Sequence, residues 1–292
     1  MRHVSVLLHT AVDILSLSSE DCAIDATGGS GGHAELLAQK IGKKGKLLVL
    51  DQDGDAITRL TERFSSFPQV LIRKTNFRHI REVAEELSLP PVQAVLFDLG
   101  MSSEQIESSG RGFSFLRDEP LLMTQGDGEH LFTAMDIVNT WEEQNIADII
   151  FSYGEEPAAR RIAKALVTAR RGGLITSSRT LAHIVEGAKG GRHGRIHPAT
   201  KTFQALRIAV NDELGALKEG LEGAWNALGR GGRIAVITFH GIEARIVKGF
   251  LKEKKKEGLC TILTRHALRA TREEVLANPR ARSASLYALS KN

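Results

Sequence analysis

Three carboxylates stand where apolar runs end in the first hundred residues: Asp25, Asp51 and Asp98. The first is followed closely by the glycine-rich stretch Gly28-Gly-Ser-Gly-Gly32. Glycines let a backbone approach a ligand closely, and the N–H groups at the start of a following helix attract anionic groups. A carboxylate at the end of a second strand can accept hydrogen bonds from the ribose hydroxyls of an adenosine. These residue types predict a site for a nucleoside-containing cofactor, with Asp51 on its ribose.

The glycine-rich stretch by itself does not choose between cofactors. The segment from Gly29 to Ala34 fits the pattern G-x-G-x-x-A, which suits a nicotinamide cofactor or S-adenosylmethionine, and a tight turn without any ligand is a further interpretation. Asp25 favours the methyl donor, because a carboxylate there could meet the donor's ammonium but would be poorly placed beside a pyrophosphate. Asp98 ends the strand that faces the reacting methyl in such folds, although a carboxylate at that point can also cap a loop or helix.

The elements that would position these residues alternate between strand and helix. Apolar runs predict strands at 22–27, 46–51, 70–73, 92–98, 233–239 and 285–289, and helical spacing predicts helices at 33–41, 56–64, 79–87, 179–187, 200–228 and 243–257 and several within 134–171. Gly215 and Gly220 are candidate breaks in the long helix. The alternation predicts an α/β fold with a doubly wound parallel sheet. Because it stops after residue 100, we expect a sheet domain of residues 1–100 and 211–292, interrupted by a mainly helical domain of residues 101–210.

Composition limits the class of protein. The chain has 292 residues, of which 42% are hydrophobic and 25% charged, as in globular proteins. Two cysteines, Cys22 and Cys260, cannot build a disulfide scaffold or a four-thiolate zinc site, and they suit a reducing compartment. No apolar run reaches 18 residues, and Met1–Leu17 does not read as a signal peptide. We therefore expect a cytoplasmic protein without a membrane segment and without a metal site.

The net charge of +4 hides an asymmetry between the two halves. Residues 1–150 hold 13 Lys+Arg and 23 Asp+Glu, a net of −10, and residues 151–292 hold 26 and 12, a net of +14. The stretch 187–211 carries five Lys+Arg, two His and no acid, and a second basic run is 252–256. Clustered cations of this kind favour contact with nucleic acid phosphates, although the run 252–256 alone would more simply be a solvated helix face.

Long motifs, in order along nearly the whole chain, resemble the RsmH (MraW) family of ribosomal RNA methyltransferases. They are Asp25-Ala-Thr-Gly-Gly-Ser-Gly-Gly-His33, Leu50-Asp-Gln-Asp53, Asp98-Leu-Gly-Met-Ser-Ser-Glu-Gln105, Arg111-Gly-Phe-Ser-Phe115, Tyr153-Gly-Glu-Glu156, His197-Pro-Ala-Thr-Lys-Thr-Phe-Gln-Ala-Leu-Arg-Ile208, Thr238-Phe-His240 and Asn278-Pro-Arg-Ala-Arg-Ser283. The resemblance implies a Rossmann-like methyltransferase fold with an inserted helical domain. It implies methyl transfer from S-adenosylmethionine to the exocyclic N4 amine of a cytidine in 16S rRNA of the small ribosomal subunit.

The resemblance also implies roles for individual residues. Gly31, Gly32 and His33 would contact the donor, Asp51 would hold its ribose, Phe77 would pack near the adenine, and Asp98 and Gln105 would complete the donor site. For His33 the alternative is a helix-start residue satisfied by the backbone, and Phe77 by itself would be assigned to the core. Ser103, Arg111, His197, Lys201 and Arg207 are candidate contacts to the RNA substrate, with internal ion pairs as the alternative for Lys201 and Arg207.

The acceptor's chemistry gives Asp98 a catalytic role. A cytosine amine is a poor nucleophile because its lone pair is conjugated with the ring. Catalysis must therefore place the amine in line with the methyl and accept its hydrogen bonds as it pyramidalises. Asp98 or nearby backbone carbonyls are the expected acceptors. The target base must also be unstacked to reach the methyl group.

The chain departs from the family's pattern on the acceptor side. Leu122 and Thr124 replace an acid and an arginine, Gly241 and Ala244 alter the motif after Phe239-His240, and Tyr287 stands where the family has arginine. These changes motivate an alternative, a diverged member that binds the ribosome and the donor without catalysis. A nicotinamide-dependent oxidoreductase is a third hypothesis, based only on the glycine pattern and Asp51.

Overall fold

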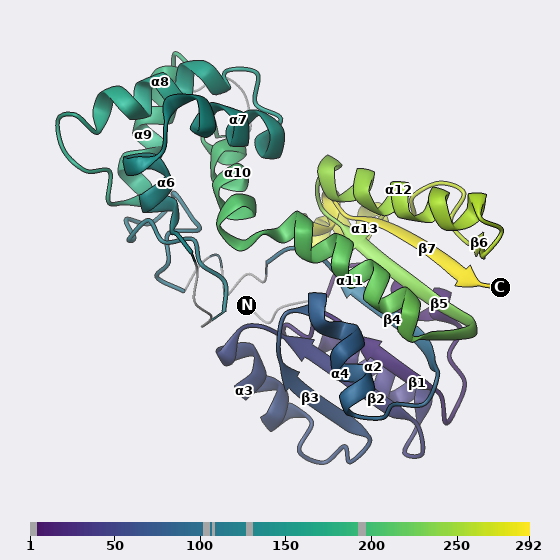
Figure 1. Cartoon of the computed structure of the whole chain (residues 1–292). Coiled ribbons are helices and arrows are strands. Elements are labelled where there is room, and N and C mark those ends of the chain that lie inside the picture. The colour runs from purple at the N-terminus through teal and green to yellow at the C-terminus, as the bar shows by residue number, and fades with distance from the viewer. Residues whose placement is uncertain (1–4, 102–105, 107–108, 127–130, 192–196) are drawn as a thin grey trace. The chain divides into compact units, whose positions relative to one another are not determined.

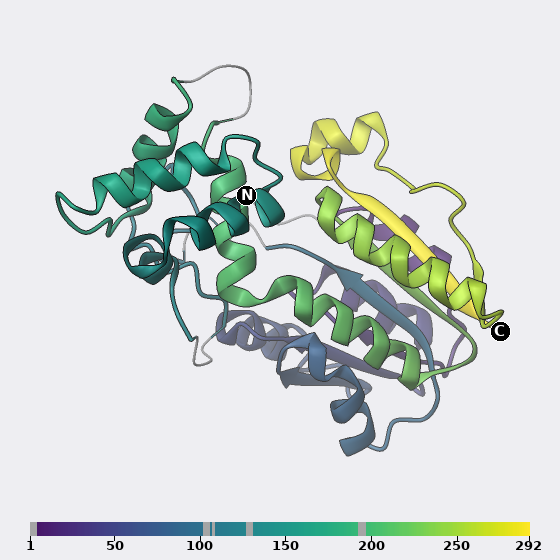
Figure 2. The same cartoon turned by 45° about the horizontal axis from the view of Figure 1, so that its top comes forward.

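The computed structural model describes residues 5–101, 106, 109–126, 131–191 and 197–292. The chain forms two compact units (Figures 1 and 2). The first, here the sheet unit, combines Met1–Gly100 with Leu214–Asn292, and the second, the inserted unit, is Met101–Glu213. Within the described parts of the chain, no helix is both long and apolar enough to cross a membrane.

A seven-stranded sheet forms the centre of the sheet unit. Its strands are β1 (Cys22–Asp25), β2 (Lys46–Asp51), β3 (Val70–Lys74), β4 (Val92–Asp98), β5 (Leu228–Thr238), β6 (Cys260–Ile262) and β7 (Ser285–Lys291). They lie in the order β3-β2-β1-β4-β5-β7-β6, and β7 is antiparallel to β5 and to β6, whereas the other pairs are parallel. This is the Rossmann-like methyltransferase fold, as the sequence predicted.

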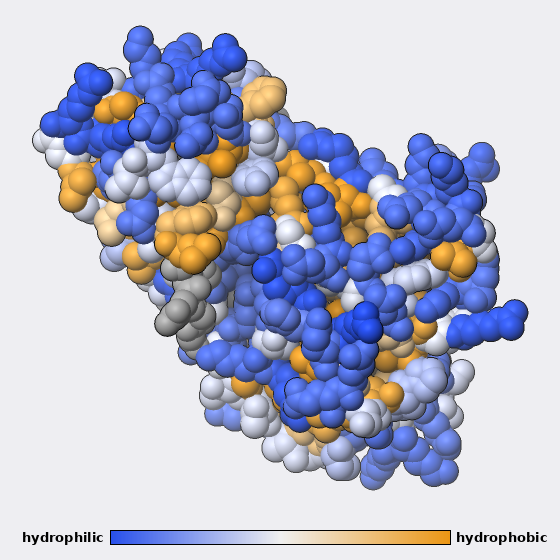
Figure 3. Space-filling view, viewed as in Figure 1, coloured by the Kyte–Doolittle hydropathy of each residue, from blue (hydrophilic) through white to orange (hydrophobic). Residues whose placement is uncertain are grey.

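Helices cover both faces of this sheet. The sheet unit contains α1 (Leu8–Leu15), α2 (Gly32–Ile41), α3 (Gly54–Arg63), the 3-10 helix η1 (Phe77–His79), α4 (Ile80–Glu86), α11 (Glu213–Ala227), α12 (Gly241–Lys256), α13 (Arg272–Ala277) and the 3-10 helix η2 (Pro279–Arg282). One core packs α1, α2 and α3 against Leu47 and Leu96, and the other packs α4, α11 and α12 against Leu48 and Phe97. Because successive strand residues point to opposite faces, each apolar run supplies both cores. On the visible face of this unit, hydrophilic side chains predominate and apolar residues occur in smaller groups (Figure 3).

The parallel pairing brings the three carboxylates to one edge of the sheet. Asp25 pairs in register with Val49 of β2 and Leu96 of β4, and Asp98 pairs with Ile237 of β5. Asp51 is the last residue of β2. All three therefore lie at the carboxyl ends of adjacent strands, where ligands bind in open α/β sheets.

The inserted unit has its own apolar core. Its helices are α6 (Ala134–Thr140), α7 (Glu143–Gly154), α8 (Ala159–Ala169), α9 (Ser178–Ala188) and α10 (Thr200–Asn211). Ile150, Leu166 and Phe203 are among the side chains that they bury together. Thr133 begins α6 through a capping box with Asp136, which fixes the first turn of that helix.

Some elements differ from the sequence prediction. The helix expected over 200–228 is two helices, and the break lies at Asp212, with φ of 46°, rather than at Gly215 or Gly220. An aspartate tolerates the left-handed conformation better than most residues, and periodicity does not reveal that one is used. The predicted boundary at 210/211 lies three residues before the observed one at 213/214. Strand β6 and helices α1 and α13 were not predicted.

Candidate active site

The glycine-rich loop connects β1 to α2. Gly29 and Gly31 have φ of 51° and 82°, and Gly31 is the residue before the first turn of α2. A Cβ on Gly32 would lie 2.2 Å from the Ser5 hydroxyl oxygen. The backbone conformation of Gly29 and Gly31 and the lack of space at Gly32 therefore require glycine. Without side chains here, a ligand can reach the backbone N–H groups that begin α2.

Asp51 is tied to this loop. One carboxylate oxygen accepts a hydrogen bond from the Gly29 N–H at 2.7 Å, and the other accepts one from the Asp53 N–H at 2.9 Å. Burial raises the pKa of Asp51 above 3.8, and the two N–H donors act in the opposite direction. Each carboxylate oxygen keeps a lone pair, so Asp51 is oriented to accept hydrogen bonds from two adjacent hydroxyl groups.

Thr27 links Asp25 to Asp98. Its N–H donates to an Asp25 carboxylate oxygen at 3.1 Å, and its hydroxyl oxygen accepts a hydrogen bond from the Asp98 N–H at 2.7 Å. Burial, the largest cause, and the negative charge of nearby Asp51 together raise the pKa of Asp25 to about 7. Burial also raises the pKa of Asp98 well above 3.8, as do the negative charges of Asp25 and Glu243. Among the described residues, the second carboxylate oxygen of Asp25 and one carboxylate oxygen of Asp98 are buried without a hydrogen-bond partner.

His33 lies beside Asp98 in the first turn of α2. Its side chain is 4% exposed, its Nε2 lies 3.1 Å from the Val6 carbonyl oxygen, and its Nδ1 lies 3.5 Å from an Asp98 carboxylate oxygen. Because a carbonyl can only accept, Nε2 carries a proton and donates it to Val6. His33 therefore presents Nδ1 to the carboxylate of Asp98.

Phe77 lies further along the same edge, in η1 after β3. The Thr75 N–H donates to the Asp51 carbonyl at 2.8 Å, and Asn76 donates to Gln52 at 2.8 Å, so the ends of β2 and β3 are held together. Phe77 is half-buried and meets Phe97 edge-to-face at 5.6 Å. It thus packs against the core on the side of Phe97. Gln105 and Ser103 lie outside the described residues.

These residues fit S-adenosylmethionine. The buried, unpartnered oxygen of Asp25 suits a cationic ammonium, the oriented carboxylate of Asp51 suits ribose hydroxyls, and the N–H groups that begin α2 suit a carboxylate. A pyrophosphate would instead meet the negative charges of Asp25 and Asp98.

The substrate candidates of the inserted unit have internal partners. Arg111 donates to the carbonyls of Thr124 and Gly126, and His197 stacks on Phe115 at 4.2 Å between ring centroids. The Lys201 ammonium donates to the Glu155 carbonyl at 2.8 Å. Arg207 forms a two-pronged pair with Glu213, at 2.7 and 2.9 Å.

The two basic runs predicted from the sequence, 187–211 and 252–256, contain lysines that pair with acids of the fold. Lys189 donates to the buried carboxylate of Glu156 at 2.7 Å, whereas Arg192, His193 and Arg195 lie outside the described residues. Lys254 is 8% exposed and pairs with Glu222 at 2.9 Å. Both lysines are engaged in ion pairs within the fold, and Lys254 is also buried, so neither is a simple surface cation.

Three contributors to the site were not predicted from the sequence. Thr27 connects two of the carboxylates, the Val6 carbonyl orients His33, and Glu243 adds negative charge near Asp98. The motif that contains Thr27 gave a signal, because the residue lies between Asp25 and the glycines. Val6 and Glu243 also lie near or within family motifs, but only tertiary structure brings them to His33 and Asp98.

Comparison with known proteins places the chain in a family. The family model described as the MraW methylase family matches residues 1–292. A ribosomal RNA small subunit methyltransferase H from Symbiobacterium thermophilum is 43% identical, over 99% of this chain and 96% of that protein. The proteins of the same name from Brevibacillus brevis and Dehalococcoides mccartyi are 40% and 39% identical, over 99% and 97% of this chain and 98% and 85% of theirs.

The chain is also similar to solved structures. An rRNA methylase from Streptococcus thermophilus aligns over 99% of this chain and 98% of its own, with a TM-score of 0.46 and 12% sequence identity. The family match and the curated relatives do not favour the nicotinamide hypothesis. On the full-length model match and the identities of 39–43%, this chain belongs to the MraW methylase family and is an S-adenosylmethionine-dependent methyltransferase.

Proposed function

We propose that this protein methylates the exocyclic N4 amine of a cytidine in 16S rRNA of the small ribosomal subunit. The observation that carries the proposal is the similarity, over 97–99% of the chain, to proteins named ribosomal RNA small subunit methyltransferase H. With such a substrate, the protein would act in the cytoplasm, where small subunits are assembled.

The donor-side roles follow from the chemistry of each residue. Asp51 accepts hydrogen bonds from the ribose hydroxyls, Asp25 meets the ammonium, and Gly32 provides an N–H group for the carboxylate. Gly31 shapes the turn, because its own N–H donates to the Gly28 carbonyl at 2.8 Å. Phe77 and Gln105 are carried over from the family as adenine and donor contacts. S-adenosylmethionine supplies the activated methyl group.

Asp98 carries the acceptor-side chemistry in this proposal. Its unpartnered oxygen accepts a hydrogen bond from the cytosine amine, which localises the lone pair on N4 and orients it toward the methyl. Transfer leaves one proton too many on N4. A carboxylate whose pKa is raised well above 3.8 is a better proton acceptor than an ordinary aspartate, so Asp98 receives that proton. The His33 ring lies against Asp98, with Nδ1 3.5 Å from its other carboxylate oxygen, and so limits rotation of that carboxylate.

The inserted unit would recognise RNA. Its substrate candidates are Ser103, Arg111, His197, Lys201 and Arg207. Arg207 is already neutralised by Glu213, so its contribution would be to fix α10 rather than to bind phosphate directly. Lys201 is exposed, and its ammonium donates to the Glu155 carbonyl, so its charge remains available to phosphate.

A gene deletion tests the proposal. We expect mass spectrometry of rRNA nucleosides to show the loss of one N4-methylated cytidine in the deletion strain and its return on complementation. Unchanged methylation would contradict the substrate assignment. The alternative, a diverged member that binds the donor without catalysis, rests on Leu122 and Thr124, and methyl transfer to purified small subunits in vitro would exclude it.

A further inference from the structure

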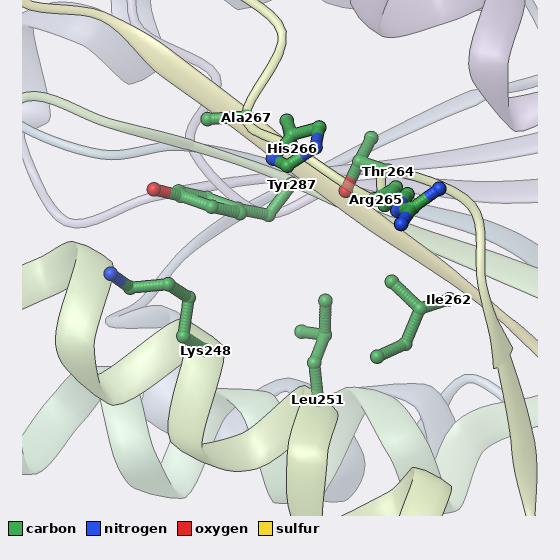
Figure 4. A pocket seen from close by; sticks show the side chains of 8 residues that line it. All are labelled: Lys248, Leu251, Ile262, Thr264, Arg265, His266, Ala267 and Tyr287. Atoms are coloured by element: carbon green, nitrogen blue, oxygen red, sulfur yellow. The ribbon is translucent and has the colours of Figure 1, made fainter.

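A cavity of about 320 Å³ lies between α12 and the β6–β7 end of the sheet unit. Leu251 and Ile262 lie on one side, and the ring of Tyr287 lies across the open space from them (Figure 4). None of its lining residues belongs to the donor site described above. Its volume is sufficient for a heterocyclic base with part of its sugar.

The walls and the rim of this cavity differ in chemistry. Tyr287 and Leu251 are 8% and 4% exposed, so they form an ordered apolar wall. Lys248, Arg265 and His266 are exposed and line the same cavity, with no acidic side chain among the described lining residues. Lys248 and Arg265 have no ion-pair partner within the part of the chain that the structure describes. An aromatic and aliphatic wall beside unpaired cations matches a nucleotide, which has a flat base and an anionic phosphate.

The charge around the cavity favours a polymer over a single small anion. Residues 214–292 contain 15 Lys+Arg and 7 Asp+Glu. Lys252, Lys255 and Lys256 continue along α12 from Lys248 and are exposed. Successive cations along one helix can follow successive phosphates of a nucleic acid strand.

We propose that this cavity binds one unpaired nucleotide of the RNA substrate, at a position away from the base that is methylated. The base lies against Tyr287, and Lys248 and Arg265 neutralise the flanking phosphates. Only an unpaired base can enter such a cavity, so the segment bound is single-stranded. The identity of the RNA rests on the proposed function, whereas the chemistry of the cavity does not.

Binding of a fluorescein-labelled single-stranded RNA dodecamer of mixed sequence, measured by anisotropy on the full chain, tests this inference. We expect K248A/R265A to weaken binding by about tenfold and to lower the salt slope by about 1.4, because two phosphate contacts are lost. The matched variant K43A/K218A removes two exposed lysines of the same unit elsewhere, and we expect it to change the dissociation constant less than twofold. Tyr287→Leu should weaken binding by about fivefold or more because stacking is lost, and Tyr287→Phe should not.

Two controls make the outcome decisive. Calorimetric titration with S-adenosylmethionine should give the same dissociation constant for every variant, which shows that each one is folded. Methyl transfer to purified small subunits by the unaltered protein tests the proposed function separately from RNA binding. Equal RNA binding by K248A/R265A and K43A/K218A would overturn the inference, as would saturation of the cavity by cytidine monophosphate without any competition from the RNA.

Discussion

His33 Nδ1 lies 3.5 Å from a carboxylate oxygen of Asp98, and the opposite ring nitrogen of His33 is bound to the Val6 carbonyl at 3.1 Å. The carbonyl contact fixes the orientation of the imidazole, because rotation of the ring would break it. His33 belongs to the first turn of α2 and Asp98 to the end of β4. The pair therefore joins the start of α2, after the glycine-rich loop, to the carboxyl end of β4.

Asp98→Asn should reduce methyl transfer far more than it reduces donor binding. The amide keeps the size of the side chain but is a much poorer proton acceptor, so we expect the single-turnover rate on purified small subunits to fall by about 100-fold or more. The dissociation constant for S-adenosylmethionine should change by less than about tenfold, since one hydrogen bond is affected. Asp55→Asn, an exposed aspartate in α3, is the matched control and should keep the full rate. A full rate in the Asp98 variant would remove that residue from the chemistry.

Asp51→Ala should act on donor binding. Loss of two hydrogen bonds that the ribose hydroxyls donate to a charged carboxylate is expected to weaken S-adenosylmethionine binding by about 10- to 150-fold, as measured by calorimetry. Asp55→Ala removes the same charge from a neighbouring exposed position and should bind normally. If both variants bound the donor equally well, Asp51 would have a role only in holding Gly29 and Asp53.

Asp25 should make both stability and donor affinity depend on pH. Its pKa is about 7 in the folded chain, against 3.8 as the ordinary value. The folded state therefore binds more protons than the unfolded state between these values, so the stabilisation is complete below about pH 4 and is lost as the pH rises through about 7. Over the same range the carboxylate becomes charged, and affinity for the donor's ammonium should increase.

Urea unfolding and calorimetry at pH 5, 6, 7 and 8 measure the two effects. In Asp25→Asn we expect a smaller fall in the free energy of unfolding across this range, and an affinity for S-adenosylmethionine that varies less with pH. Identical pH profiles for the variant and the unaltered protein would contradict the role of Asp25.

Gly31→Ala should destabilise the donor loop. Gly31 has φ of 82°, and a Cβ there would lie 3.1 Å from Leu60 and Arg63 side-chain atoms. The left-handed conformation costs an alanine about 1–2 kcal/mol, so urea unfolding should show at least that loss, together with weaker donor binding. Gly249→Ala, inside α12 with open space around its Cβ, should instead stabilise by about 0.5–1 kcal/mol. A Gly31 variant as stable as the Gly249 variant would show that the loop conformation is not required.

Sequence patterns predicted six of the seven strands, because each of these contains a short run of apolar residues. Asp25, Asp51 and Asp98 end such runs, so their place at one edge of the sheet followed from parallel pairing. Short or amphipathic elements gave weaker signals: β6 has three residues, and the break at Asp212 depends on one backbone conformation.

The sequence predicted which residues form the site better than it predicted the contacts between them. Val6 and Glu243 reach the site from segments far apart in the chain, and no local pattern pairs them with His33 or Asp98. The clustered cations in the sequence also overestimate the positive charge that is available to a ligand. Lys189 and Lys254 are paired with Glu156 and Glu222. A count of lysines along the sequence does not show which of them are exposed and unpaired in the folded chain.

The most direct measurement of the central claim is methyl transfer to purified small ribosomal subunits that lack the modification. The protein and S-adenosylmethionine with a deuterated methyl group would be added, and the rRNA nucleosides analysed by mass spectrometry. We predict deuterated N4-methylcytidine at one position in 16S rRNA, formed by the unaltered protein and strongly reduced with Asp98→Asn. Label on another nucleotide, or donor binding without any label in the rRNA, would contradict the account.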